Sequence, residues 1–239
     1  MNPQTDQENA ISASEISSGA KLRLTVKESN HIALNKVFVI NPGGLEGSGR
    51  YCKDGYTYFG NEQNQSVDIM LPESEGVGKM HMCIKYDQFK KKYFLRDLGE
   101  GTGTFIMITE PVELKHGYVV SFGDSHLVTQ ICQRSIVLKF LEGPKAEEIF
   151  EFSPEDGSVS VGRMNECKIK FDDNNLSRVQ CTVTFKEPSS WFMVDGDGTK
   201  NSTNGTWVFA EDFIEIHDGM NFKVGQTLFN VKVIQLSLS

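Results

Sequence analysis

The second half of this 239-residue chain repeats the first half. The corresponding segments include 59–61 (FGN) and 161–163 (VGR), 93–97 (YFLRD) and 191–195 (WFMVD), and 103–105 (GTF) and 205–207 (GTW). The repeat length of about 100 residues is that of a whole domain, because solenoid units repeat every ~20–50 residues. The sequence therefore predicts two tandem domains of one fold, at residues 21–133 and 134–239, after an N-terminal tail of residues 1–20.

Short apolar or alternating runs follow one another along the chain, separated by clusters of Gly, Asn, Asp and Pro. In the first half these runs are residues 21–26, 36–40, 56–59, 81–86, 93–95, 104–108, 118–122 and 126–132. Alternation with period two over short runs is typical of antiparallel strands. No long stretch keeps a helical period with caps. We therefore predict an all-β fold of two tandem antiparallel β-sandwich domains.

The N-terminal tail, residues 1–20, is polar and rich in serine, and we expect it to be disordered. It has neither a basic start nor an apolar stretch, so it does not resemble a secretory signal. No apolar run of the chain approaches the ~20 residues of a membrane span. We therefore expect an intracellular protein, in the nucleus or the cytoplasm.

The chain contains five cysteines. No two of them form a CxxC pair, and none has a histidine nearby at zinc spacing. Cys83, Cys132 and Cys181 lie in predicted strands. We interpret the cysteines as reduced thiols that mostly pack in the fold, and we expect neither a metal nor another cofactor.

The balance of charge restricts the partners. The chain has 24 basic against 32 acidic side chains, a formal net charge of −8. Binding to a phosphate backbone usually requires a basic excess, which neither half has. We therefore expect no nucleic-acid partner, and no binding to an anionic membrane for the same reason.

Three segments of the second half combine donors for one anion. They are Gly162-Arg163, Ser177-Arg178 and the turn 201–207 (NSTNGTW), each at a predicted strand end or in the loop beyond it. Loops of a β-sandwich gather at its ends, so these side chains are expected to meet. Arginine presents a planar fork of donors that fits phosphate oxygens, and Ser, Thr and Asn add neutral donors. The set contains no nucleophile–base pair and no metal-ligand cluster, so it predicts binding rather than catalysis.

With these segments in place, the chain resembles two tandem forkhead-associated (FHA) domains, the β-sandwich modules that read phosphothreonine. The family pattern is Gly-Arg, Ser-Arg-x-His, Ser/Thr-Asn-Gly-Thr-Phe/Trp and a late Gly on a strand, and Gly225 supplies the last. The resemblance implies that Arg163, Ser177, Arg178 and Thr203 bind the phosphate and that Asn204 binds the ligand backbone. Gly162, Gln180 and Gly205 would support the loops. The family histidine is Gln180 here, which can still donate and accept hydrogen bonds.

The first half departs from that pattern at the positions that bind the ligand. Asn61 replaces the arginine, Gly78 replaces the serine, and residues 100–103 (EGTG) replace the Ser-Thr-Asn-Gly turn. Only Lys79 and His81 remain at the Arg and His positions. A carboxylate at Glu100 would repel a phosphate dianion. We therefore interpret the first half as an FHA fold without phosphate recognition.

Two alternatives concern single segments. Arg163 alone could be a surface arginine paired with Glu166, since exposed ion pairs are common and weak. The Gly-rich segment 41–49 superficially suggests a phosphate loop. It lacks the Gly-Lys-Ser/Thr ending and no helix follows, so we interpret it as a long loop between strands.

These observations predict a non-enzymatic adaptor. Its second domain binds phosphothreonine proteins, and its first serves as a structural scaffold or binds an assembly partner. The alternative from another class is a purely structural assembly protein in which neither domain reads phosphate.

Overall fold

The computed structural model describes Ile11, Ser14, Ile16 and residues 19–50, 54–63 and 66–235. Between Lys21 and Ile234, its elements are β-strands and two three-residue 3-10 helices, η1 (Glu73–Glu75) and η2 (Pro154–Asp156). Each of the runs predicted in the first half overlaps one of these strands. The all-β fold class is therefore confirmed. No helix among the described residues is long and apolar enough to cross a bilayer.

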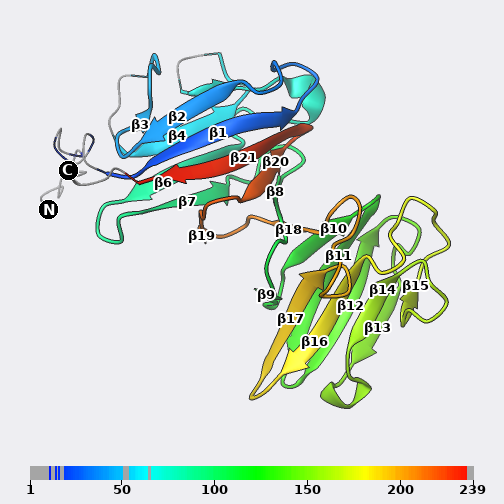
Figure 1. Cartoon of the computed structure of the whole chain (residues 1–239). Helices are drawn as coiled ribbons and strands as arrows, with labels where there is room; N and C mark the ends of the chain where they lie inside the picture. The colour runs from blue at the N-terminus through cyan, green and yellow to red at the C-terminus, as the bar shows by residue number, and fades with distance from the viewer. Residues whose placement is uncertain are drawn as a thin grey trace, which may run out of the picture. The chain divides into compact units, whose positions relative to one another are not determined.

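The strands form two compact units, and both units take segments from the two repeats (Figure 1). Unit 1 consists of the described residues of Met1–Thr104 and Ala210–Ser239, and unit 2 is Phe105–Phe209. The chain thus leaves unit 1 after Thr104, completes unit 2, and returns to unit 1 at Ala210.

Unit 1 contains two sheets, with strand orders β20-β21-β1-β2-β3 and β19-β7-β6-β4-β5. Its strands are β1 (Lys21–Glu28), β2 (Val37–Asn41), β3 (Gly44–Leu45), β4 (Tyr56–Gly60), β5 (Ile69–Met70), β6 (Met82–Asp87), β7 (Lys92–Asp97), β19 (Ile214–Glu215), β20 (Asn221–Val224) and β21 (Thr227–Ile234). Inward residues of β1 alternate with outward ones, because Leu22, Leu24 and Val26 are fully buried.

Unit 2 likewise contains two sheets, with orders β13-β12-β11-β10-β18-β8 and β15-β14-β16-β17-β9. Its strands are β8 (Thr104–Met107, which starts at the last residue of unit 1), β9 (Val112–Glu113), β10 (Val119–Phe122), β11 (Ser125–Cys132), β12 (Ser135–Glu142), β13 (Ile149–Phe152), β14 (Val159–Gly162), β15 (Ile169–Lys170), β16 (Cys181–Lys186), β17 (Ser190–Asp195) and β18 (Trp207–Phe209). Both tryptophans are buried, Trp191 at 1% and Trp207 at 5% exposure.

The sequence predicted antiparallel sheets, but two pairs of neighbouring strands run parallel. β4 runs parallel to β5, and β14 runs parallel to β15, over two residue pairs each. In both cases the second strand starts beside the end of the first strand and runs in the same direction, so its two residues pair with the last two residues of the first strand. The loop that begins at Arg163 is one of these returns.

A two-residue turn decides how the repeats share their strands. Gln133, with φ of 55°, and Arg134 connect β11 to β12, and these two strands pair along their whole length. A connection this short turns the chain straight back, so the last strand of the first repeat joins the first strand of the second. β1 then pairs with β21, the last strand of the second repeat.

The cores show the same exchange. In unit 1, the Phe59 ring of β4 contacts Phe222 at 6.2 Å and Phe229 at 5.7 Å between centroids. In unit 2, the Phe122 ring of β10 contacts Phe140 at 6.4 Å and Phe171 at 5.8 Å. Each of these contacts joins residues from opposite sides of the Gln133–Arg134 turn. The late strands of each repeat therefore complete the sandwich of the other.

The domain boundary predicted near residue 133 consequently divides the sequence repeats but not the compact units. The expectation of domains at 21–133 and 134–239 assumed that each repeat closes on its own strands. The turn at Gln133 leaves no linker with which β11 could return to β1, so the units instead break at Thr104–Phe105 and Phe209–Ala210.

Engineered disulfides test the exchange. Arg23 of β1 is the register partner of Lys232 of β21, and both side chains are exposed. We expect Arg23→Cys with Lys232→Cys to form an intrachain disulfide on mild oxidation, because partners across adjacent strands lie within bonding range. Peptide mapping of the oxidised, unreduced monomer measures the yield. Both chains of the comparison carry Cys132→Ser, because Cys132 is exposed.

The matched control combines Arg23→Cys with Gln130→Cys. Gln130 pairs with Val137 of β12, in the place that Lys232 takes beside Arg23. If the repeats closed on themselves, Gln130 would be the partner of Arg23. A chain that links 23 to 130 and not to 232 would show that the exchange does not occur in solution.

Part of the N-terminal segment packs against unit 1. Ile11 is 5% exposed, and a Cβ placed on Gly55 would lie 2.7 Å from its Cδ1. A Cβ on Gly43 would lie 2.9 Å from Cδ1 of Ile16. At these two positions the expected disordered tail instead fills space that glycines leave open. The rest of the prediction for residues 1–18, apart from Ser14, lies outside the described residues.

Candidate functional site

Three loops of unit 2 meet at one end of the sandwich. They follow β14, β15 and β17, and they carry Arg163, Ser177 with Arg178, and Thr203 with Asn204. The backbone N–H of Arg163 donates to the carbonyl of Ser177 (3.2 Å), and the N–H of Thr203 donates to Ser177 Oγ (2.8 Å). The residues predicted from separate motifs are therefore neighbours.

Gly162 and Gly205, which the sequence predicted to support the loops, lie where a side chain would not fit easily. A Cβ on Gly162 would lie 2.4 Å from the carbonyl oxygen of Arg178, so only glycine lets these two loops approach. Gly205 has φ of 78°, a left-handed conformation that side chains other than glycine rarely adopt. The two glycines thus set the spacing of the loops and the shape of the turn after Asn204.

The buried side chain of Gln180 connects these loops by hydrogen bonds. Its side chain is buried at 1% exposure, and its Nε2 donates to Ser202 Oγ (3.0 Å), the Gly205 carbonyl (3.0 Å) and Thr206 Oγ1 (3.3 Å). Its Oε1 accepts the N–H of Ser177 at 3.3 Å. Gln180 therefore braces the Ser177 loop against the Ser202–Gly205 turn.

Asp195, at the end of β17, is a buried support that sequence reasoning missed. Its carboxylate accepts the N–H of Ser202 (2.9 Å), the Ser202 hydroxyl (2.7 Å) and the Thr206 hydroxyl (2.8 Å). The sequence did offer one signal for its role, because Asp97 occupies the equivalent strand end in the first repeat. Because the carboxylate satisfies three donors, it fixes both ends of the turn that carries Thr203 and Asn204.

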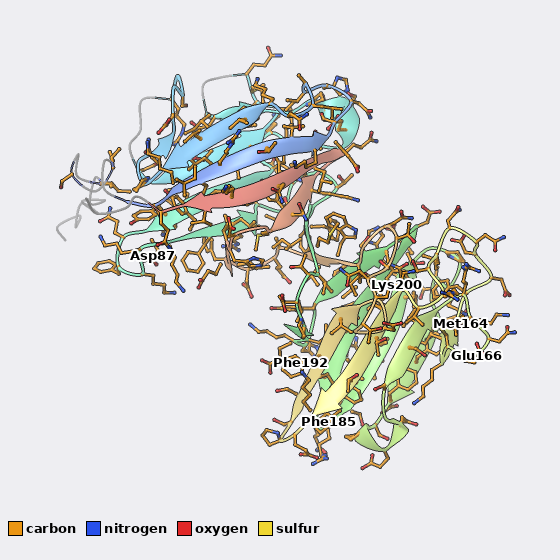
Figure 2. All side chains as sticks on the ribbon, viewed as in Figure 1. Asp87, Met164, Glu166, Phe185, Phe192 and Lys200 are labelled. Carbon is orange, nitrogen blue, oxygen red and sulfur yellow. The ribbon has the colours of Figure 1, made fainter. Side chains whose placement is uncertain are left out.

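A second aspartate shapes the loop before that turn. Asp197 Oδ1 accepts the N–H groups of Thr199 and Lys200, each at 2.8 Å, and the Thr199 hydroxyl at 2.7 Å. The Thr199 hydroxyl and these backbone hydrogen bonds lower the pKa of Asp197 to about 2. Figure 2 labels Lys200 on this loop, and Met164 and Glu166 on the loop after β14.

The outer side chains of the site remain available to a ligand. Arg163, Arg178, Thr203 and Asn204 are exposed, and Ser177 is half-buried. Within the described residues, neither guanidinium makes a hydrogen bond or an ion pair, so the alternative pairing of Arg163 with Glu166 does not form. The Asn204 amide makes one long bond, to the Asn175 carbonyl at 3.5 Å. The site thus presents two unpaired cations beside hydroxyl and amide donors.

The matching end of unit 1 is closed by its own backbone. Val77 and Gly101 form an antiparallel bridge, and the N–H of Thr102 donates to the Gly76 carbonyl at 2.8 Å. A Cβ on Gly101 would lie 2.2 Å from the Gly76 oxygen. The corresponding loops of unit 2 meet through side chains instead, because Ser177 Oγ accepts the N–H of Thr203 and the Asn204 amide donates to the Asn175 carbonyl.

The side chains of unit 1 complete this closure. Glu100 Oε2 accepts the N–H of Met80 at 2.9 Å, and the Asn61 amide donates to the Val77 carbonyl at 2.6 Å. A Cβ on Gly78 would lie 2.3 Å from Glu100 Cβ. Asn61, Gly78 and Glu100 thus serve loop packing, and a carboxylate lies in place of an anion-binding group.

His81 shows why glutamine can replace the family histidine. His81 is fully buried, and its Nδ1 accepts the N–H of Gly78 at 3.1 Å. Gln180 Oε1 accepts the N–H of Ser177, the residue that matches Gly78, at 3.3 Å. Both side chains therefore offer an acceptor to the equivalent backbone N–H. The amide nitrogen of Gln180 also donates to the Gly205 carbonyl, whereas Nε2 of His81 has no hydrogen-bond partner among the described residues.

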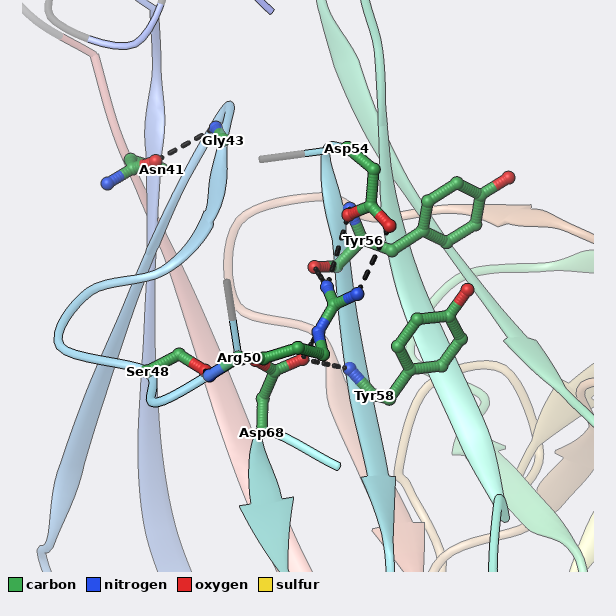
Figure 3. Close-up of polar contacts among 8 residues, drawn as sticks. All are labelled: Asn41, Gly43, Ser48, Arg50, Asp54, Tyr56, Tyr58 and Asp68. Atoms are coloured by element: carbon green, nitrogen blue, oxygen red, sulfur yellow. Dashed lines mark hydrogen bonds and ion pairs between the residues drawn. The ribbon is translucent and has the colours of Figure 1, made fainter. Parts of the chain in front are cut away.

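A cavity of about 510 Å³ lies beside the Gly-rich segment of unit 1. Arg50 lines it, and Figure 3 shows the guanidinium between Asp54, at 3.1 Å from both amino groups, and Asp68, at 3.1 Å from Nε. Burial alone would lower the pKa of Arg50, but these carboxylates raise it above its ordinary value. Two carboxylates therefore pair with this one cation. The Gly-rich segment itself is not the long loop that the sequence predicted, because β3 turns back tightly on β2 and pairs Gly44 with Asn41.

In unit 2, the loops at one end of the β-sandwich present exposed arginines together with hydroxyl groups. This arrangement is typical of a ligand-binding module. A family model for the FHA domain matches residues 57–123 and again residues 159–225. These matches cover more than half of the sequence, so the chain belongs to the FHA domain family, with two tandem copies. FHA domains are generally phosphothreonine-binding protein-interaction modules and are not catalytic. No curated protein matches the chain in sequence.

Proposed function

We propose that this protein is a phosphothreonine-dependent adaptor in which unit 2 reads the phosphorylated ligand. Arg163 and Arg178 supply charge-assisted hydrogen bonds to the phosphate, Ser177 and Thr203 add hydroxyl donors, and Asn204 binds the ligand backbone. The observation that carries this proposal is that both guanidinium groups are exposed beside those donors and make no hydrogen bond or ion pair within the part of the chain that the structure describes. An otherwise acidic chain that leaves two adjacent arginines uncompensated has a local site for an anion.

Unit 1, in this proposal, does not read phosphate and acts as a scaffold or as the binding surface of an assembly partner. The contacts of Glu100 with Met80 and of Asn61 with Val77 support this division, because both side chains are used to hold the loops together. The purely structural alternative, in which neither unit reads phosphate, would need the Arg163 site to be idle as well.

A screen of oriented phosphothreonine peptide libraries against the full chain tests the proposal. We expect selected phosphothreonine peptides to bind, and their unphosphorylated versions not to bind. The phosphoserine versions should bind more weakly. Failure of every phosphothreonine pool to bind above the unphosphorylated pools would favour the structural alternative.

Calorimetry with a selected peptide tests the division between the units. We expect a stoichiometry of one peptide per chain, because the exposed Arg163 and Arg178 lie in unit 2, whereas unit 1 has Asn61 at the position of Arg163 and a carboxylate at Glu100. Arg163→Ala should remove this binding and uncover no second, weaker saturable event. Two binding events, or saturable binding that survives Arg163→Ala, would contradict the assignment of unit 1.

A further inference from the structure

We propose that Met107, a residue of the first repeat, positions the recognition turn of the second repeat. This inference rests on the proposed function, because it concerns the turn that carries Asn204. Met107 ends β8, which pairs with β18 directly after that turn. Met107 is thus a positioning residue and does not itself touch the ligand.

Met107 lies directly beneath the turn. A Cβ placed on Gly205 would be 3.1 Å from Met107 Cε and 3.3 Å from Trp207 Nε1. The indole Nε1–H in turn donates to the Asn204 carbonyl at 3.2 Å. The Met107 methyl group packs against Gly205, and the Trp207 indole holds the Asn204 carbonyl. These two side chains therefore support residues 204 and 205 from the core side of the turn.

The backbone of the same strand adds a second attachment. The N–H of Ile108 donates to the Thr206 carbonyl at 2.8 Å. Trp207 is the register partner of Met107 on one side and of Ser121 on the other. Met107, Ile108 and Ser121 all precede the Gln133 turn, so strands of the first repeat flank the turn of the second.

The orientation of the Asn204 side chain depends on these contacts of Met107 and Trp207. Among the described residues, its one hydrogen bond is the 3.5 Å contact to the Asn175 carbonyl, so its direction follows from its backbone. Gln180 and Ser177 hold that backbone from within the second repeat. Met107 and Trp207 contact the same backbone from strands β8 and β18. Shortening Met107 would leave a cavity beside Gly205 and let the turn shift.

A substitution series in the full chain tests the positioning role. Met107→Ala should weaken binding of a selected phosphothreonine peptide by about three- to thirtyfold, the range expected for coupling between contacting residues. Met107→Leu refills the volume and should restore most of the affinity. Met70→Ala, at an exposed position of β5 in unit 1, is the matched control and should bind like the parent.

A double-mutant cycle with Asn204→Ala separates positioning from general destabilisation. If Met107 acts through Asn204, Met107→Ala should change the affinity by less than about twofold once Asn204 is absent. Equal losses in both backgrounds would assign Met107 a merely structural role and overturn the proposal.

A readout without ligand distinguishes the failure of this inference from failure of the proposed function. Met107→Ala should shift the backbone amide resonance of Gly205 and the side-chain amide resonances of Asn204, whereas Met70→Ala should leave them unmoved. If the parent binds phosphothreonine, Arg163→Ala abolishes binding, and Met107→Ala changes neither affinity nor these resonances, only the positioning role is wrong. If no phosphothreonine peptide binds the parent, the proposed function fails, and unmoved resonances would then exclude the positioning role as well.

Discussion

Arg163→Ala is expected to abolish measurable phosphothreonine binding while leaving the melting of unit 2 unchanged. Arg163 is exposed, and no hydrogen bond or ion pair of its guanidinium is found within the described residues. Its loss therefore removes little from the folded state. Each hydrogen bond to a charged group contributes about 1.5–3 kcal/mol, so losing a two-pronged contact should weaken binding by about 10- to 100-fold. Titration calorimetry with one selected peptide and parallel thermal melts measure both effects.

Two related variants and one control define the cause. Arg163→Lys should recover part of the affinity, because an ammonium keeps the charge but not the fork of donors. Ser177→Ala removes a neutral hydroxyl and should cost less than Arg163→Ala. Arg23→Ala, at an exposed position of unit 1, should bind like the parent. Parent-like affinity of Arg163→Ala with an unchanged melt would refute phosphate reading by this site.

The largest loss of stability is expected from Gln180→Leu. This variant leaves the half-buried Ser177 N–H and the buried Gly205 carbonyl without the side chain that pairs with them. The Ser202 and Thr206 hydroxyls lose their bond from Gln180 but keep their bonds to Asp195. Each buried polar group left unpaired costs about 1–3 kcal/mol. We therefore expect the unfolding transition of unit 2 to fall by about 10 °C or more. Differential scanning calorimetry follows this transition, and peptide affinity should fall with it because the loops lose their common brace.

Gln180→His is the matched control for that variant. The imidazole keeps one acceptor and one donor, and His81 already makes the corresponding acceptor contact to Gly78 in unit 1. We expect Gln180→His to retain most of the stability and affinity. If Gln180→Leu melted with the parent, the buried hydrogen bonds of Gln180 would not be what holds these loops.

The candidate site was largely readable from the sequence, because its outer groups lie in short motifs at strand ends. Arg163, Ser177 and Thr203 come from separate segments, yet strand ends of a sandwich leave few places for their loops. Asp195 was not identified, because an aspartate at the end of a strand is common and nothing local shows which donors will reach it. Its three hydrogen bonds depend on where the chain returns at Ser202 and Thr206.

The sequence predicted only part of what distinguishes the equivalent loops of unit 1. The replacements Asn61, Gly78 and Glu100 predicted the loss of phosphate binding from charge and chemistry alone. The mutual contact of the loops could not be predicted, because it depends on Gly76 and Gly101 lying opposite each other across the bridge to Val77. Glycine permits such an approach without specifying its partner.

By itself the sequence determined the strands, the duplication and the chemistry of the open site, because period-two alternation and short motifs act over a few neighbouring residues. Only the tertiary structure decided which strands belong together. β11 and β21 are equivalent in the two repeats, so local pattern cannot tell which of them pairs with β1. The turn at Gln133 and Arg134 resolves this choice, because two residues allow β11 to fold back on β12 and leave β21 to complete the first sandwich.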